Sequence, residues 1–282
     1  MPYTATLPKQ RPFGETSRPD AWWIQPLLVF LGFSAFIVYS TWAAFQGLDS
    51  AHCYYWYGAD ESGYTANYIS PFYSPDLFGY PSHPGIFGLV PSWWPGWVPY
   101  SPAFLIMWIP AGFRFTCYYY RGAYYKAFWL DPVNCTVGEP RKSYLGERYL
   151  PLILQNVHRY FFYLAFVFIL ILAYDAWLGM WFTDDAGVKH FGIAVGTLVL
   201  VINVVLLGGY TFGCHSLRHL IGGFLDSQSR VPACAKGFAC VSCLNHQHML
   251  WAWLSLFWVG FTDVYIRLCA MGIWHDFRFF TL

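Results

Sequence analysis

Apolar residues along this chain gather in five long stretches, which polar or mixed segments separate. The stretches cover residues 22–45, 97–117, 158–181, 190–214 and 247–272. A helix needs about 20 mostly apolar residues to cross the roughly 30 Å of hydrocarbon in a bilayer, and each stretch comes near that length. The pattern therefore predicts an all-α integral membrane protein with five transmembrane helices, in which residues 1–282 form a single membrane domain.

The composition supports a membrane protein and argues against two other classes. Hydrophobic residues make up 57% of the chain and charged residues 11%, which is too apolar for an ordinary water-soluble domain. The first stretch lacks a small-residue cleavage site and is longer than the apolar part of a signal peptide, so we expect it to remain as a helix. A net charge of +1 without a basic cluster gives no support for nucleic-acid binding.

Positive charges are distributed unevenly between the segments that join the stretches. Residues 46–96 contain no Lys or Arg, whereas the N-terminal tail and the segments after the second and fourth stretches contain several. Because short loops rich in Lys and Arg stay in the cytoplasm, we expect the N-terminus to be cytoplasmic and the C-terminus to lie outside. The cationic residues of these three segments are Lys9, Arg11, Arg18, Arg121, Lys126, Arg141, Lys142, Arg148, Arg218, Arg230 and Lys236.

Two of the connecting segments are rich in aromatic residues. Residues 46–96 also contain many Pro, Gly and Ser, so we expect an aromatic outside loop between spans one and two, with turns but no regular secondary structure. Residues 117–130 place aromatic side chains on one helical side, together with Arg121 and Lys126. This pattern predicts an interfacial helix that leaves the second span.

Four residues with metal-binding side chains stand at the ends of the last four stretches. They are Cys117, His158, Cys214 and His248, and the expected topology places all four on the cytoplasmic side. Two thiolates and two imidazoles are the ligands of a Rieske-type [2Fe–2S] cluster, and they also suit a tetrahedral zinc site. Each residue alone is more simply explained as a small buried side chain or an interfacial histidine. Their coincidence in side and depth favours a metal centre.

Other cysteines and histidines compete for the same role. His215 and His219 are four residues apart and share one helix face, which suits a metal or a small polar ligand. Cys135, in the inner loop DPVNCTVGEP that follows the second stretch, is an alternative to Cys214 as the second thiolate. The segment CAKGFACVSC contains a CxxC spacing, which is a weak zinc signal without a second pair, and we interpret it as a loop feature. Its cysteines are Cys234, Cys240 and Cys243.

Haem is the main alternative cofactor. Two stacked haems need histidines in the middle of facing spans, and the first three stretches have none there. One haem near the inner face, held by His158 or His219 together with His248, stays open as a less well supported alternative. The chain has too few histidines for a histidine-box di-iron enzyme.

Several motifs resemble a known family. They are TCYYYRGAYYKAFWL at residues 116–130, LILQNVHRYFFY at 152–163, CHSLRHLIGG at 214–223, HMLWAW at 248–253 and YISPFYSP at 68–75. Together they resemble the membrane subunit of succinate dehydrogenases of the haem-free actinobacterial class. The similarity runs from about the first span to the C-terminus.

The resemblance implies a cytochrome b-like membrane-anchor subunit of a succinate:quinone oxidoreductase in the plasma membrane. Its expected partners are a flavoprotein subunit, an iron–sulfur subunit, membrane lipid and quinone, and the anchor has no independent catalytic activity. The family carries a membrane-embedded Rieske-type [2Fe–2S] cluster in place of haem b. We therefore expect Cys117, His158, Cys214 and His248 to be its ligands in this chain.

Quinone reduction needs hydrogen-bond donors near the centre. Arg159, Tyr160 and His219 lie next to the proposed ligands in sequence and are the expected quinone-binding residues, although Arg159 also suits contact with lipid headgroups. Trp251 and Trp253 can flank a quinone ring or anchor the helix at the interface. Two rival interpretations remain, namely a haem b anchor of the same complex and a structural anchor with a zinc staple.

Overall fold

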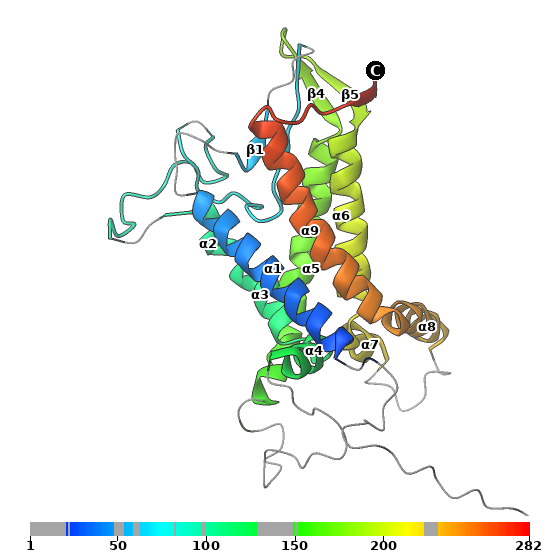
Figure 1. Ribbon diagram of the computed structural model, residues 1–282. Helices are drawn as coiled ribbons and strands as arrows, with labels where there is room; N and C mark the ends of the chain where they lie inside the picture. The colour runs from blue at the N-terminus through cyan, green and yellow to red at the C-terminus, as the bar shows by residue number, and fades with distance from the viewer. Residues whose placement is uncertain are drawn as a thin grey trace, which may run out of the picture.

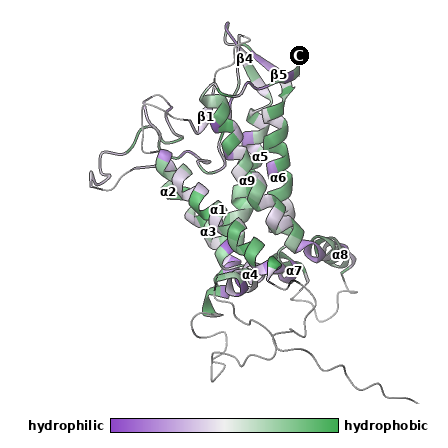
Figure 2. Ribbon diagram, in the orientation of Figure 1, coloured by the Kyte–Doolittle hydropathy of each residue, from purple (hydrophilic) through white to green (hydrophobic). Residues whose placement is uncertain are grey.

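The computed structural model describes residues 21, 23–47, 54–58, 63–81, 83–97, 100–128, 149, 152–222 and 231–282. Within these residues four helices are long and apolar enough to cross a membrane. They are α1 (Ile24–Gln46), α5 (His158–Leu178), α6 (Val195–Phe212) and α9 (His248–Ala270). They form an elongated bundle (Figure 1), and hydrophobic residues cover most of their length (Figure 2).

The expected second span is not one continuous helix. Helix α2 (Pro102–Ile106) is followed by α3 (Trp108–Phe115), with a break at Met107. Proline has no amide hydrogen, and its ring collides with the carbonyl group four residues earlier in a helix. Pro110 therefore cannot continue the helix that ends at Ile106. The two helices still run beside the bundle, α3 against α5 and α2 near α1.

Short helices collect at one end of the bundle, where α1 begins (Figure 1). Helix α4 (Tyr118–Phe128) agrees with the helix expected after the second stretch. It is accompanied by a 3₁₀ turn (Leu152–Gln155), α7 (His215–Gly222) and α8 (Pro232–His246). The expectation of a loop over the CxxC segment was wrong, because this segment forms α8. Proline at the first turn favours the start of that helix, and packing on α7 and α6 supports it.

A small sheet occupies the opposite end. Strands β4 (Trp181–Asp184) and β5 (Lys189–Ala194) form a hairpin, to which β2 (Tyr64–Thr65) and β6 (Arg278–Thr281) add in the order β2-β4-β5-β6. Strand β1 (Trp56–Tyr57) pairs with β3 (Tyr68–Ile69). The third and fourth spans are therefore shorter than expected, and the outside loop does contain regular structure. The two-residue strands β1, β2 and β3 are too short to produce an alternating pattern in the sequence.

The segment YISPFYSP ties this end of the bundle together. Three of its hydroxyl groups donate hydrogen bonds to carboxylates from other parts of the chain. Tyr68 bonds Asp276 at 2.8 Å, Ser70 bonds Asp263 on α9, and Ser74 bonds Asp175 on α5. Tyr73 in the same segment donates to the Ala43 carbonyl at 2.5 Å, at the end of α1. One loop segment therefore links α1, α5 and α9.

A buried ion pair lies next to this segment. Arg267 Nε donates to Asp263 Oδ2 at 2.7 Å, and the two side chains are 3% and 0% exposed. Tyr39 donates to the same carboxylate oxygen at 2.5 Å, and Arg267 also donates to the Ala43 carbonyl at 3.1 Å. The two charges cancel, and α1 and the loop provide further hydrogen bonds to both side chains.

Helices α6 and α9 approach closely at Gly209. A Cβ atom at Gly209 would lie 2.6 Å from the Trp251 ring, whereas a Cβ at Gly208 would lie 3.6 Å from Phe212. We expect Gly209→Ala to lower the free energy of unfolding by about 1–3 kcal/mol, because overpacking forces the ring or the helices to shift. Gly208→Ala, the matched control, should have little effect. Equal thermal unfolding midpoints for the two variants in the purified protein would contradict this packing.

Candidate metal centre and polar cavity

The four candidate ligands converge at the end of the bundle that holds α4, α7 and α8. Cys117 lies between α3 and α4, Cys214 lies between α6 and α7, and His158 and His248 are the first residues of α5 and α9. His158 Nε2 is 3.0 Å from Cys214 Sγ, and His248 Nε2 is 3.6 Å from Cys117 Sγ. Both cysteines belong to one buried cluster. The structure thus brings together four helix ends that are far apart in sequence.

Thr116 fixes the orientation of the His158 ring. The Thr116 hydroxyl donates to the Gly112 carbonyl at 2.8 Å, in the last turn of α3. Because its hydrogen is used there, its oxygen accepts at the 2.9 Å contact with His158 Nδ1. This hydrogen bonding assigns the proton to Nδ1 and leaves the Nε2 lone pair directed toward Cys214. A histidine whose second nitrogen is held in this way is typical of metal sites.

Two aromatic rings cover the imidazoles. Phe113 stacks on His158 with ring centroids 4.7 Å apart, and Tyr210 stacks on His248 at 5.0 Å. Sequence reasoning missed Phe113, Tyr210 and Thr116. The available signal was helical spacing, since Phe113 precedes Cys117, and Tyr210 precedes Cys214, by four residues.

The four candidate ligands suit some metal centres better than others. Among the described residues no three His, Cys, Asp or Glu side chains surround one point closely enough to hold a single ion. The arrangement consists of two Cys–His contacts, whereas a tetrahedral zinc site needs four ligands around one ion. A binuclear cluster needs two ligands for each iron. His248 Nδ1 is buried and has no hydrogen-bond partner in the described part of the chain, so this donor set fits a bound group.

One backbone hydrogen bond reaches the sulfur atom of Cys214. The Ser216 amide donates to Cys214 Sγ at 3.4 Å, from the first turn of α7. Hydrogen bonds to ligand sulfurs are among the means by which a protein adjusts an iron–sulfur centre. The alternative ligand Cys135 lies outside the described residues. Cys234, Cys240 and Cys243 lie on α8, where the last two are exposed.

The three expected quinone-binding residues line one polar cavity. Arg159 and Tyr160 of α5 and His219 of α7 surround a space of about 380 Å³. The other lining residues are Gln155, Asn156, His215 and Ser216. The cavity adjoins two of the candidate ligands in the chain, because Arg159 follows His158 and the pair His215 and Ser216 follows Cys214.

The two tryptophans considered for the same role lie elsewhere. Neither is among the residues that line the polar cavity. Trp251 packs against Gly209, and Trp253 Nε1 donates to the Tyr119 hydroxyl at 2.8 Å while its ring stacks on Phe257. Both tryptophans therefore take part in helix packing at this end of α9.

Comparison with known proteins identifies the family of this helical bundle. The chain matches the family model described as actinobacterial succinate dehydrogenase subunit SdhC over residues 24–272. It is similar to a chain of the Mycobacterium smegmatis Sdh1 complex in the apo form, with 40% identity and a TM-score of 0.78, over 97% of this chain and 98% of that chain. No curated protein matches. The chain belongs to the actinobacterial SdhC family and is a multi-pass plasma-membrane anchor subunit of a succinate dehydrogenase complex.

Proposed function

We propose that this subunit binds a Rieske-type [2Fe–2S] cluster and passes electrons from an iron–sulfur subunit to quinone. The observation that carries the proposal is the convergence of Cys117, His158, Cys214 and His248 from four separate helix ends. When bound, the cluster supplies a one-electron carrier next to the polar cavity. The protein supplies the ligands, excludes water from them and holds the quinone.

Binding of a Rieske-type cluster requires the side chains to change partners. In the structure each cysteine contacts a histidine, whereas a Rieske-type cluster has two thiolates on one iron and two imidazoles on the other. The regrouped pairs would be Cys117 with Cys214 and His158 with His248, and the two Cys–His contacts already lie at the same end of the bundle.

Thr116 provides a test of the ligand geometry that leaves all four ligands in place. We expect Thr116→Val to lower the affinity for the cluster about 10–100-fold, as is typical when a metal-binding histidine loses its hydrogen-bond partner, and therefore to lower the iron and acid-labile sulfide content of the purified complex. Thr116→Ser keeps the hydroxyl acceptor and should retain the cluster. Full occupancy in the valine variant would show that the contact with His158 Nδ1 does not support the site.

The polar cavity is the proposed quinone site. A quinone needs hydrogen-bond donors at its carbonyl oxygens and a source of protons, and Arg159, Tyr160 and His219 supply both kinds of group around one space. Arg159 and Tyr160 follow His158 directly in α5, and His215 and Ser216, which line the same cavity, follow Cys214. We therefore assign quinone contact to these three residues.

Substitutions in the cavity should separate quinone binding from cluster binding. We expect Arg159→Met and His219→Ala each to raise the KM for quinone about tenfold, which corresponds to the loss of one hydrogen bond of about 1.5 kcal/mol. The iron content should stay unchanged. Arg218, which lies on α7 and packs on the Phe238 ring, provides the control, since Arg218→Gln should leave the KM unaltered. An unchanged KM in both cavity variants would contradict the assignment.

The membrane topology of the proposal follows from the charge pattern. We propose that the N-terminus is cytoplasmic, which places the metal site and the cavity at the inner face, where the soluble flavoprotein and iron–sulfur subunits dock. We also propose that α2 and α3 together make the fifth crossing. Their helical residues span roughly 20 Å, and the residues that flank them extend that length.

Visible absorption distinguishes the proposed cluster from haem b, the rival cofactor. A haem b anchor gives a sharp α-band on reduction, and a structural anchor gives neither that band nor an iron–sulfur signal. We expect the purified complex to lack the α-band. A stoichiometric haem would replace the cluster proposal with the haem alternative.

A further inference from the structure

Arg114 carries a positive charge inside the helical bundle and has only neutral partners in the described part of the chain. Its NH1 donates to the Tyr120 hydroxyl at 2.5 Å and to the Ala252 carbonyl at 3.1 Å, and its NH2 donates to Ser255 Oγ at 2.9 Å. The ion pairs found among the described residues involve other side chains. Hydrogen bonds hold the guanidinium in place without cancelling its charge.

Arg114 lies next to the candidate ligands. Its guanidinium carbon is 4.7 Å from the centre of the Tyr210 ring, and the same ring stacks on His248. Ala252 and Ser255, which bind it, follow His248 by four and seven residues and so share its face of α9. Arg114 also interacts electrostatically with His248. The charge therefore sits one ring away from a ligand.

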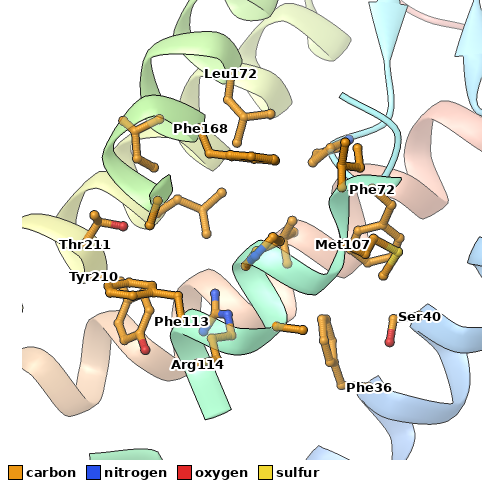
Figure 3. A pocket seen from close by; sticks show the side chains of 18 residues that line it. Phe36, Ser40, Phe72, Met107, Phe113, Arg114, Phe168, Leu172, Tyr210 and Thr211 are labelled. Atoms are coloured by element: carbon orange, nitrogen blue, oxygen red, sulfur yellow. The ribbon is translucent and has the colours of Figure 1, made fainter. Parts of the chain in front are cut away.

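Arg114 is half-buried, and its surroundings are largely apolar. Figure 3 shows it beside Phe113 and Tyr210 at one end of a cavity of about 130 Å³. Apolar side chains such as Phe168, Leu172 and Met107 form much of the remaining wall. With few dipoles to respond, a fixed charge acts more strongly there than in water.

A charge at such a position is costly to keep. Ionisable side chains within membrane helices are rare, and those present usually serve a function. Arg267 provides the contrast, because it is neutralised by Asp263 at 2.7 Å. Arg114 has no such partner among the described residues, so a negative charge that arises nearby during turnover is a candidate to balance it.

We propose that Arg114 raises the reduction potential of the bound cluster by stabilising its reduced state. The inference rests on the proposed function. Two ferric ions, two sulfides, two thiolates and two neutral imidazoles have no net charge. One electron from a reduced iron–sulfur centre of the partner subunit converts one ferric ion to ferrous, and the cluster gains a single negative charge without making or breaking a bond. The fixed charge of Arg114 favours this state.

The test is an EPR-monitored redox titration of the purified complex. We expect Arg114→Gln to lower the ratio of reduced to oxidised cluster at a fixed ambient potential at least about tenfold, equivalent to about 59 mV for one electron. Ser255→Asp provides a second route to the same result. It keeps the arginine but places a carboxylate where the serine hydroxyl now accepts from NH2, and it carries the test if the glutamine variant does not assemble.

Two variants control for changes in packing. Arg114→Lys keeps the charge, and Ser255→Asn is close in shape to Ser255→Asp but adds no charge, so both should stay within about threefold of the unmodified protein, well under one 59 mV step. If the cluster signal is normal and its potential is the same in all variants, the role of Arg114 is overturned but the proposed function is not. A potential lowered equally by the lysine and glutamine variants would also overturn that role. The absence of a cluster signal from the unmodified complex would overturn the proposed function as well.

Discussion

Replacement of His158 and His248 together by alanine is expected to leave the complex assembled but without its Rieske-type EPR signal, and to lower quinone reduction by at least about a hundredfold. Loss of a residue that only supports a metal ligand costs about 10–100-fold, and here both imidazoles of one iron would be lost. The bundle should persist, because α5 packs against α3 and α6, and α9 packs against α6 and α1. Gel filtration, EPR and quinone reduction by the same preparation provide the measurement.

The control for this experiment is His246, the last residue of α8. It is exposed and only two residues from His248, so His246→Ala should keep both the signal and the activity. Normal quinone reduction in the double alanine variant would contradict the assignment of the cluster to these histidines. If Cys135→Ser removed the signal and Cys214→Ser did not, the second thiolate would have to be reassigned to Cys135.

Arg267→Leu is expected to have the largest effect on stability. It leaves the Asp263 carboxylate, which is 0% exposed, as an uncompensated charge, and breaking a buried pair in this way costs about 3–5 kcal/mol. The remaining donors, Tyr39 and Ser70, come from α1 and the outside loop, so that loop should loosen as well. Thermal unfolding of the purified complex measures the effect.

The double variant Arg267→Leu with Asp263→Leu shows whether the charge is the cause. Replacement of a buried pair by apolar side chains is often close to neutral, so the double variant should be more stable than Arg267→Leu alone. Equal or lower stability in the double variant would mean that packing against Trp42 and Tyr73, whose rings lie 5.6 Å from the Arg267 guanidinium, accounts for the loss instead.

The fold could be predicted from the sequence wherever one helix extends over a long apolar run. The helices α1, α5, α6 and α9 all lie within expected stretches or differ by a few residues. The break between α2 and α3 was missed although Pro110 signals it, because hydropathy alone does not register a missing amide donor. The β2-β4-β5-β6 sheet could not be foreseen as a whole, since β2 pairs with β4 more than a hundred positions away, and β6 joins β5 across the whole of α6 and α9.

Of the candidate site, the sequence was sufficient to group the four candidate ligands and three of the residues that line the polar cavity. Cys117, His158, Cys214 and His248 stand at helix ends that topology brings to one side, so the charge pattern was sufficient to group them. Residues that act on those ligands through space could not be grouped in the same way. Arg114 is an example, because its proximity to His248 depends on how α3 packs against α9, and no spacing in the sequence encodes that contact.

The proposed Rieske-type [2Fe–2S] cluster at the four converging helix ends is open to one decisive measurement. This is EPR of the purified, reduced complex, combined with counts of iron and acid-labile sulfide. We expect a Rieske-type signal that belongs to this subunit, because His158→Ala with His248→Ala should remove it. If the unmodified complex lacks that signal, or if the double variant retains it in full, this subunit does not hold the cluster at these residues.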